Sequence, residues 1–309
     1  MNIGIIGLGR MGHAIAARLV SGGYEVIAYD LSSEALQAVV QVGAAPASSL
    51  AEVVAKARIV WLMVPAGKIV DHLLLQLQQH LQPGDIVVDG GNSFFKDSIR
   101  RAQQLATQKI IFLDCGTSGG LQGAVDGFCL MIGGEREAFD TLEPALKTIS
   151  APHRYAYVGP SGAGHYVKMV HNGIEYSLLQ AYAEGFALLA GQQDYPNLDL
   201  EKISALWNHG SIIRSWILEL LEKVFAQHGQ TLNDVSGILA QGGTGLWTAQ
   251  EADKNNIAMP LLHEALILRH LSATSGQDEY ANKIVALLRH QFGGHPYTLK
   301  KDEKNDENN

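Results

Sequence analysis

The sequence predicts an α/β domain built on a parallel sheet, followed by a domain made only of helices. In the first half of the 309-residue chain, short runs of β-branched residues alternate with segments of helical periodicity, which is typical of a parallel sheet covered on both faces. After about residue 160 the strand-like runs stop. A glycine-rich motif between the first strand and the first helix indicates a Rossmann-type dinucleotide-binding domain.

The strand-like runs of the first half lie at residues 3–6, 25–29, 58–64, 85–89 and 109–114. Segments with the helical pattern lie between them at residues 10–21, 33–41, 68–80 and 95–107. The sequence Ser49-Leu50-Ala51-Glu52 matches a capping box and predicts the start of one further short helix.

In the second half, helical patterns lie at residues 162–190, 200–208, 212–227, 259–274 and 279–290. The turn Gly159-Pro160-Ser161-Gly162 precedes them. We therefore predict a dinucleotide-binding domain at 1–161 and an all-helical domain for substrate binding and oligomerisation at 162–299. The tail, 300–309, has no apolar residue and is expected to be disordered.

The composition excludes several classes of function. The formal net charge of -8 leaves no visible basic face for a nucleic acid. Cys115 and Cys129 lack metal-type spacing, so we expect two reduced thiols and no metal site. The chain has no signal-like leader and no apolar run of the ~18 residues that a membrane span needs, so we expect a cytoplasmic protein without a membrane partner.

The glycine-rich motif follows the first strand and opens the first helix as Gly7-Leu8-Gly9-Arg10-Met11-Gly12. In this context Gly7 permits the tight turn, Gly9 lets the backbone approach a pyrophosphate, and Gly12 allows the helix to pack on the strand. The helix N-terminus attracts the phosphates through its amides and its dipole. The alternative is a strand–helix turn without a ligand.

Asp30 ends the second strand near the offset of ~20 residues expected for the acid that binds the adenosine ribose. Its carboxylate can accept hydrogen bonds from the ribose hydroxyls and would repel a 2′-phosphate. No Arg follows closely, so the sequence favours NAD over NADP. Alternatively, Asp30 caps the next helix, although Ser32 or Ser33 could do so instead.

Two later loops also follow strand ends, where ligands of such sheets bind. The loop Val64-Pro65-Ala66-Gly67 could pass under the cofactor, with Val64 in contact. Asn92, in Asp89-Gly90-Gly91-Asn92-Ser93, could bind the nicotinamide amide or a substrate hydroxyl. An equally good reading of Asn92 is a turn residue with positive φ or a helix cap.

The predicted helix at 162–190 carries the stretch GHYVKMVHNGIEY, residues 164–176. Lys168, His171 or Asn172, and Glu175 or Tyr176 share one helical face. An apolar stripe on the opposite side is expected to form core, and it consists of Val167, Val170, Ile174 and Leu178.

A Lys and a Glu on one face can act as base and acid once their surroundings tune their protonation. A lysine that is desolvated, or that lies near a cationic nicotinamide, can lose its proton near neutral pH. Neutral Lys168 could then accept a hydroxyl proton as hydride leaves the same carbon, and protonated Glu175 could return a proton to carbon. The alternative is a solvated polar stripe.

Over nearly its whole length the chain resembles the decarboxylating 6-phosphogluconate dehydrogenases in their shorter form. The run Lys168-Met169-Val170-His171-Asn172-Gly173-Ile174-Glu175-Tyr176 is highly specific to that family, whereas related 3-hydroxyacid dehydrogenases share the nucleotide domain and the Lys but not this run. The other shared motifs are the glycine-rich motif, Val88-Asp89-Gly90-Gly91-Asn92-Ser93, Ser118-Gly119-Gly120 and Gly243-Thr244-Gly245-Leu246-Trp247-Thr248.

The resemblance implies oxidation and decarboxylation of 6-phosphogluconate to ribulose 5-phosphate and carbon dioxide, with NAD as acceptor. Lys168 would act first as base and then as acid, and Glu175 would protonate C1 of the enediol. The residues that would bind the sugar acid are Asn92, Ser118, Gly119, Gly120, His171 and Asn172. Ser118-Gly119-Gly120 could also be an ordinary tight turn.

The resemblance also assigns the substrate phosphate. Tyr176 and Arg269 would bind it, together with Arg289 and His295 from a partner chain, which requires at least a dimer. Arg suits phosphate because its planar fork can bond two oxygens. Gly242 stands where longer members have a phosphate-binding Lys, which puts phosphate affinity in doubt. Alternatively, Arg269 is a surface charge and His295 a turn residue.

Two other functions remain open at this stage. A 3-hydroxyacid dehydrogenase that does not decarboxylate would share the nucleotide domain and the Lys. A non-catalytic NAD-binding sensor would be expected to lack an acid or a base, yet both Lys168 and Glu175 are present.

Overall fold

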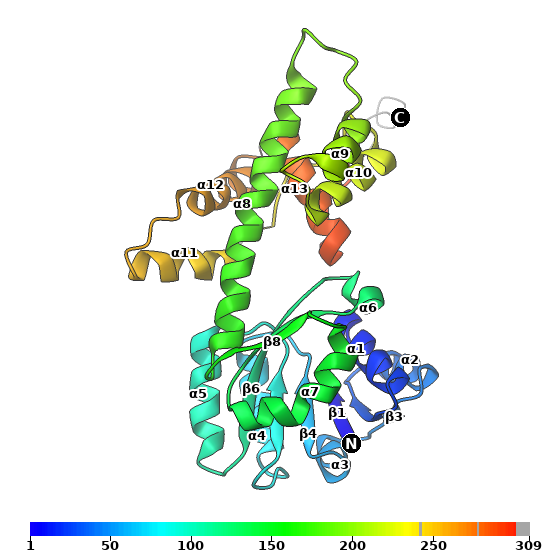
Figure 1. Ribbon diagram of the computed structural model, residues 1–309, viewed down its shortest axis with the longest axis vertical. Coiled ribbons are helices and arrows are strands. Elements are labelled where there is room, and N and C mark those ends of the chain that lie inside the picture. The colour runs from blue at the N-terminus through cyan, green and yellow to red at the C-terminus, as the bar shows by residue number, and fades with distance from the viewer. Residues whose placement is uncertain (241–242, 277, 301–309) are drawn as a thin grey trace, which may run out of the picture. The chain divides into compact units, whose positions relative to one another are not determined.

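The computed structural model describes residues 1–240, 243–276 and 278–300 (Figure 1). By internal packing the chain divides into two compact units, Met1–Val170 and His171–Asn309. The predicted boundary between residues 161 and 162 stays a prediction. Each unit is described by itself below.

Within the described residues, the first unit contains one eight-stranded sheet in the order β3-β2-β1-β4-β5-β6-β7-β8. All neighbouring strands are parallel except β6 and β7, which are antiparallel. The strands are β1 (Asn2–Ile6), β2 (Glu25–Tyr29), β3 (Ala45–Pro46), β4 (Ile59–Leu62), β5 (Ile86–Asp89), β6 (Ile111–Ser118), β7 (Cys129–Gly133) and β8 (Tyr155–Gly159).

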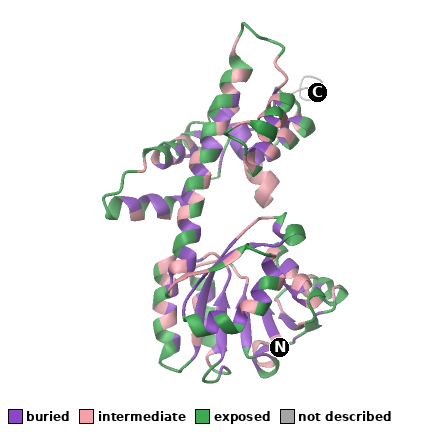
Figure 2. Ribbon diagram, viewed as in Figure 1, coloured by how far each residue is buried: buried purple, intermediate pink, exposed green. Residues whose placement is uncertain are grey.

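Helices cover both faces of this sheet, as the alternating pattern predicts. One buried cluster joins strand residues such as Ile3 and Trp61 to α1 and α7, and the other joins Ile6 and Val60 to α3, α4 and α5. The central strands β4 and β5 are buried along their whole length (Figure 2). The helices are α1 (Arg10–Ser21), α2 (Ser33–Gln41), α3 (Leu50–Lys56), α4 (Lys68–Leu77), α5 (Phe95–Ala106), α6 (Gly123–Asp126) and α7 (Arg136–Ser150).

The predicted elements of the first 110 residues are confirmed, with ends that shift by a few residues. The prediction was wrong where it ended the strand at Asp114, because β6 continues to Ser118 and pairs with the unpredicted β7. The analysis of the sequence also missed β3, β8, α6 and α7. Helix α3 begins at a true cap, since Ser49 accepts from the amide of Glu52, but the Glu52 carboxylate accepts from Ser48 rather than completing the box.

The second unit is helical, apart from an isolated bridge between Val235 and Leu299. The prediction missed α11 and began α10 too early, because Ser215 caps it by accepting from the amide of Leu218. Helix α8 begins in the first unit and continues into the second. The helices are α8 (Ala163–Gly191), α9 (Leu200–Gly210), α10 (Trp216–His228), α11 (Thr244–Lys254), α12 (Pro260–Ser275) and α13 (Tyr280–Gly293).

The apolar stripe expected to form core on α8 does not do so. Ile174 is 52% exposed, and Val167 and Leu178 are exposed as well. The opposite side of the helix is buried instead, including Lys168 with 6% exposure and the ring of Tyr176. Lys168 and Tyr176 of the polar face are therefore buried, whereas His171 of the same face is exposed.

No helix among the described residues is long and apolar enough to cross a membrane. Of the tail predicted to be disordered, only Lys300 is described, and its backbone N–H donates to Asp234 O over 2.9 Å. Residues 301–309, and Gly242, lie outside the described residues.

Candidate functional site

The three glycines of the motif differ in what surrounds them. Gly7 has φ 93°, and a Cβ there would lie 2.6 Å from Met63 O. A Cβ on Gly12 would lie 2.0 Å from Gly7 O, so α1 packs directly on the turn. Around Gly9 there is nothing within 4 Å. The first and third glycines are thus needed for folding, while the space at Gly9 suits a ligand.

Helix α1 begins beyond Gly9 without a side-chain cap among the described residues. Its first amides can therefore face an anion, as a pyrophosphate site requires. Leu8 is buried in the preceding turn, Arg10 is exposed and Met11 is half-buried in the first turn of α1. These residues fit a dinucleotide along the motif.

Asp30 lies directly after β2 and joins it to the glycine-rich turn. Its Oδ2 accepts from the amide of Leu8 over 2.6 Å, and its Oδ1 accepts from the amide of Ser32 over 2.8 Å. Ser32, not Asp30, caps α2 by accepting from the amide of Ala35. Asp30 is therefore not the cap of α2. Its half-buried carboxylate lies beside the glycine-rich motif.

Asn92 is a turn residue whose side chain bonds the backbone of β6, and its predicted contact with a ligand stays a prediction. Its φ is 54°, in the left-handed region, as expected for a turn residue. Its Nδ2 donates to Thr117 O over 3.0 Å and its Oδ1 accepts from Thr117 N over 2.8 Å. An amide side chain has two N–H groups and two acceptor lone pairs, so this pairing orients Asn92 and leaves capacity for a ligand.

The loops after β4 and β5 touch each other. A Cβ on Gly91 would lie 2.4 Å from Val64 O. Val64, predicted to contact the cofactor, therefore lies against the segment that carries Asn92.

Lys168 is held against the end of β6 by two glycines. A Cβ on Gly116 would lie 2.5 Å from the Cβ of Lys168 and 2.6 Å from Gly164 O. A Cβ on Gly164 would in turn lie 2.4 Å from Asp114 O. Because neither strand nor helix carries a side chain at this crossing, α8 approaches β6 closely and Lys168 is buried beside it.

Asp114 fixes the start of α8. Its carboxylate, fully buried, accepts from the amide of Gly162 over 2.6 Å and from the amide of His165 over 2.8 Å. These bonds satisfy amides of the first helical turn and place a negative charge at its positive end. Asp114 therefore sets the position of Lys168 along the strand.

Ser118 is the last residue of β6, and Gly119 and Gly120 follow it with φ of 114° and 53°. Left-handed geometry at both positions explains why glycines stand there. The first unit thus brings Lys168, Asn92 and Ser118 together around the carboxyl ends of β5 and β6.

The second unit carries the remaining residues predicted for the site. His171 Nδ1 lies 3.0 Å from Asn172 Oδ1 and 4.0 Å from Glu175 Oε2. Asn172 Nδ2 donates to Thr244 Oγ1, at the start of α11, over 2.5 Å. Glu175 is half-buried. The polar face of α8 is therefore joined to α11 through Asn172.

Tyr176 and Arg269 form a stacked pair. The Arg269 Cζ lies 3.5 Å from the centroid of the Tyr176 ring. The glycines of Gly243-Thr244-Gly245 make room for this ring, since a Cβ on Gly245 would lie 2.5 Å from it and a Cβ on Gly243 would lie 2.7 Å from its hydroxyl. Arg269 is thus an internal residue and not the surface charge offered as an alternative.

The guanidinium of Arg269 is 4% exposed, and its Nη1 has no hydrogen-bond partner among the described residues. Burial lowers the pKa of Arg269, and the nearby charge of Arg289 acts in the same direction. Buried cations usually have an anionic partner. A guanidinium left in this state is prepared to receive an anion such as a phosphate.

Arg289 is half-buried on α13, and His295 is exposed beyond its end. His290 Nδ1 lies 3.0 Å from His295 O, which fixes the turn that carries His295. The structure describes one chain and leaves the predicted contribution of these two residues to a partner untested.

Four residues that position the site were not predicted, namely Asp114, Gly116, Thr117 and Thr244. An internal glycine in a strand signals a close backbone approach, so Gly116 could have been noticed. The partners of Asp114 and Thr117 lie far away in sequence and carried no such signal.

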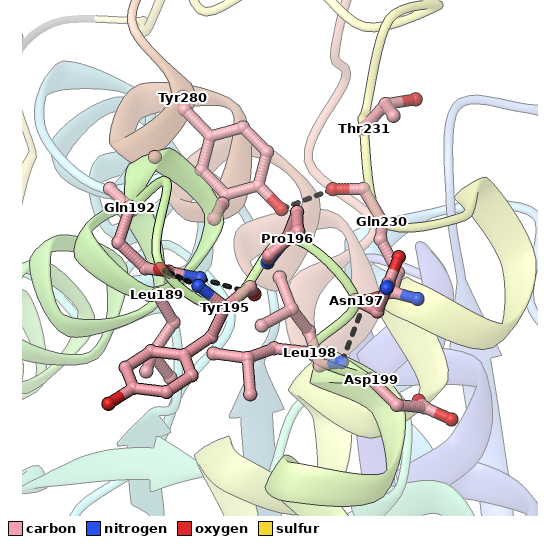
Figure 3. A pocket seen from close by; sticks show the side chains of 14 residues that line it. Leu189, Gln192, Tyr195, Pro196, Asn197, Leu198, Asp199, Gln230, Thr231 and Tyr280 are labelled. Carbon is pink, nitrogen blue, oxygen red and sulfur yellow. Dashed lines mark hydrogen bonds between the residues drawn. The ribbon is translucent and has the colours of Figure 1, made fainter.

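A cavity of about 690 Å³ lies elsewhere in the second unit, at the end of α8 and the start of α9 (Figure 3). Tyr280 and Gln230 border it and are joined by a hydrogen bond from the tyrosine hydroxyl to Gln230 O. None of the predicted site residues lines it. Neutral polar and apolar side chains and the carboxylate of Asp199 line it, and none of the described lining residues is a Lys or an Arg that a phosphorylated ligand could bind.

Two family models match the chain almost end to end. Residues 2–159 match the NAD binding domain of 6-phosphogluconate dehydrogenase, and residues 164–308 match the C-terminal domain of the same enzyme.

Among curated proteins, the chain is 46% identical to the NAD(+)-dependent, decarboxylating 6-phosphogluconate dehydrogenase of Haloferax volcanii, covering 98% of this chain and 100% of that protein. It is 37% identical to the NADP(+)-dependent, decarboxylating enzyme of Bacillus subtilis, covering 88% of this chain and 61% of that protein. The cofactors named for these relatives therefore differ.

Among solved structures, the 6-phosphogluconate dehydrogenase of Plasmodium falciparum aligns with a TM-score of 0.83 and 30% identity over 89% of this chain and 63% of that one. The 3-hydroxyisobutyrate dehydrogenase of Mycobacterium tuberculosis aligns with a TM-score of 0.73 and 22% identity over 93% of this chain and 99% of that one, which shows a shared fold.

The open space at Gly9 predicts a change that separates ligand binding from folding. In Gly9→Ala the new methyl group meets no protein atom, so the melting temperature is expected to stay within about 2 °C of the wild type. The methyl group occupies the approach to the pyrophosphate, so the Kd for NADH should rise at least about tenfold, or ~1.4 kcal/mol. Fluorescence titration with NADH measures the change.

Gly12→Ala is the matched control, because its methyl group would collide with Gly7 O and should destabilise the fold by about 1–3 kcal/mol or more. If Gly9→Ala bound NADH with wild-type affinity, the glycine-rich motif would not be part of the NADH-binding site.

The crossing of α8 and β6 predicts the effect of Gly116→Ala. The methyl group must displace Lys168 and the backbone of α8, so kcat should fall at least about tenfold and stability should drop by about 1–3 kcal/mol. Steady-state kinetics and thermal unfolding give both values. Gly210→Ala, at a helical glycine with nothing within 4 Å, should change neither. A Gly116→Ala enzyme with wild-type kcat would contradict the proposed placement of Lys168.

Proposed function

The chain belongs to the 6-phosphogluconate dehydrogenase family, and on that premise we propose that it oxidises and decarboxylates 6-phospho-D-gluconate to D-ribulose 5-phosphate and carbon dioxide with NAD as acceptor. The observation that carries the proposal is Lys168, a lysine buried against β6 beside Asn92 and Ser118. A buried amine next to a nucleotide-binding loop is suited to proton transfer.

In the first step Lys168, as the neutral amine, takes the proton from the 3-hydroxyl while hydride leaves C3. NAD, when bound, supplies the hydride acceptor. The substrate becomes a 3-keto acid, and the protonated Lys168 beside the new carbonyl polarises it. The C1–C2 bond then breaks and carbon dioxide leaves. The electron pair of that bond forms the enediol as Lys168 gives its proton to the former carbonyl oxygen, so that the reaction needs no metal.

Glu175 completes the reaction as general acid. It lies seven residues after Lys168 on α8, a spacing that places two side chains on one helical face. Protonated Glu175 gives its proton to the carbon that lost carbon dioxide, Lys168 takes the proton of the adjacent hydroxyl, and ribulose 5-phosphate results. His171 and Asn172, between the two in sequence, bind substrate hydroxyls, and the other substrate-binding residues of the proposal are Asn92, Ser118, Gly119 and Gly120.

NAD is the preferred cofactor in this proposal because of Asp30. Its carboxylate lies beside the glycine-rich turn and would accept from ribose hydroxyls but repel a 2′-phosphate. The name of the Haloferax volcanii relative supports NAD, whereas that of the Bacillus subtilis relative shows that the family also includes NADP enzymes.

The phosphate of the substrate is assigned to Tyr176 and Arg269, with Arg289 and His295 from a partner chain. The unmatched Arg269 guanidinium supports this assignment. Its position in a stack on Tyr176 keeps the cation fixed before the anion arrives, so little side-chain entropy is lost on binding.

A homo-oligomer, at least a dimer, completes the proposal. The exposed apolar residues of the second unit support it, since Ile174, Leu178, Leu188 and the fully exposed Ile212 are large side chains that the described part of the chain leaves exposed. Leu218, Leu220 and Leu221 of α10, by contrast, are buried in the core of the unit.

The experiment that tests the function is an assay of purified protein with 6-phosphogluconate and NAD or NADP. Reduced cofactor and carbon dioxide are measured together, and equal yields are expected. Reduced cofactor without carbon dioxide would favour a dehydrogenase that does not decarboxylate. Lys168→Met should abolish turnover while NADH still binds, and near-normal turnover would remove Lys168 as the base.

In Asp30→Ala the preference for NAD over NADP is expected to decrease at least about tenfold, or ~1.4 kcal/mol. The ribose of NAD loses a hydrogen-bond acceptor, and the 2′-phosphate of NADP is no longer repelled by the carboxylate. The ratio of kcat/KM for the two cofactors measures it. Asp30→Asn, which keeps the size and one acceptor, should give a smaller change. An unaltered ratio in both variants would count against the ribose role.

Arg269→Met is expected to raise the KM for 6-phosphogluconate at least about tenfold, since the anion loses a fixed cation. Stability should change little, because the substitution removes a buried charge whose Nη1 lacks a partner but also its stack on the Tyr176 ring. Residual turnover of unphosphorylated gluconate should not change. If kcat/KM fell equally for both substrates, Arg269 would not bind the substrate phosphate.

A further inference from the structure

Arg101, on α5, is a fully buried arginine that bonds both the end of β5 and the start of α4. Its Nη1 lies 3.3 Å from Asp89 Oδ2, its Nη2 donates to Gly67 O over 2.9 Å, and its Nε donates to Asp71 Oδ1 over 2.8 Å. Asp89 is fully buried as well. A buried ion pair contributes little to stability on average because its desolvation is costly, so its presence calls for another reason.

One end of this network determines the shape of the loop that carries Asn92. The Asp89 carboxylate accepts from the amide of Gly91 over 3.1 Å and from Ser93 Oγ over 2.7 Å. These two bonds lie on either side of Asn92, whose φ of 54° is an uncommon conformation for a residue with a side chain. Asp89 therefore holds Asn92 in its left-handed turn, and Arg101 holds Asp89.

The other end of the network determines the loop after β4. Gly67, which has φ 93°, precedes α4 and gives its carbonyl to Arg101. Asp71 lies in the first turn of the same helix. Since Gly91 lies against Val64 O, the two loops also touch directly. The Arg101 guanidinium thus connects Gly67, at the end of the loop after β4, to Asp89, at the start of the loop after β5.

We infer that Arg101 is a positioning residue, which holds the Val64–Gly67 loop and the Gly90–Ser93 loop in register so that Asn92 and Val64 meet the nicotinamide and the reacting carbon correctly. The inference rests on the proposed function for those two loops. Arg101 itself does not touch substrate or cofactor. It acts through the Asp89 carboxylate and the Gly67 carbonyl.

Arginine suits this task for a geometric reason. Its planar fork presents five N–H donors in fixed directions, whereas a lysine concentrates its charge at one atom. Arg101→Lys therefore keeps a positive charge against Asp89 but cannot also reach Gly67 O and Asp71. The variant therefore tests the connection between the two loops while the positive charge next to Asp89 is kept.

The neighbouring Arg100 provides a matched control. It also bonds Asp71, over 2.9 Å, and bonds Asp97 over 3.1 Å, but it contacts neither Asp89 nor Gly67 in any bond that the structure records. Arg100→Lys makes the same chemical change one residue away and should leave the two loops as they are.

The first measurement is kinetic. Arg101→Lys is expected to lower kcat about tenfold, while the Kd for NADH, which depends mostly on the glycine-rich motif, changes less than about threefold. In an Asn92→Ala background the same substitution should lower kcat by less than about threefold, because its effect passes through Asn92. The inference would be overturned if Arg101→Lys had wild-type kcat, or if the losses of kcat from Arg101→Lys and Asn92→Ala were fully additive in the double variant.

The second measurement does not depend on activity. Amide hydrogen exchange should become faster in both loops together in Arg101→Lys and in neither loop in Arg100→Lys. If Arg101→Lys does not fold, Ser93→Ala, which removes one bond to Asp89, takes its place and should speed exchange at residues 90–93 with a smaller loss of kcat. Unchanged exchange in both loops would overturn the inference. If the wild-type protein were inactive on 6-phosphogluconate, the proposed function would be wrong, and the exchange rates alone would decide whether Arg101 holds the two loops together.

Discussion

The close crossing of α8 and β6 is the constraint on which the candidate site depends. Gly116 and Gly164 leave the two backbones without side chains at the point of contact, and Asp114 fixes the start of the helix. As a result Lys168 is buried at the end of the strand that also presents Ser118. The same strand holds Asn92 through the backbone of Thr117. One strand therefore arranges three residues that come from distant parts of the sequence.

Much of this arrangement could be predicted from local sequence. The glycine-rich motif and Asp30 follow from backbone geometry and charge that are readable within 30 residues, and α1 and α2 have the predicted bounds. The length of β6 could not be predicted, because its last residues pair with β7, whose register depends on the folded sheet. The roles of Asp114 and Thr117 were hidden for the same reason, since their partners are tertiary.

The orientation of α8 shows where periodicity alone misleads. A helix with a polar face and an apolar face is expected to bury the apolar one. In this chain the apolar residues Ile174 and Leu178 are exposed, while Lys168, Tyr176 and Arg269 are inside. Burying charged side chains is costly, and that cost is consistent with a face that serves a charged ligand. The exposed stripe then needs other cover, which a partner chain can supply.

The empty surroundings of Gly9 have a consequence for how the enzyme responds to acidity. At that point the backbone offers a ligand main-chain amides and the end of a helix, and neither gains nor loses a proton in the range where enzymes work. The attraction that the motif exerts on a pyrophosphate is therefore constant across that range. Any rise or fall of turnover with acidity has to originate in side chains elsewhere, among them the amine and the carboxyl group of α8.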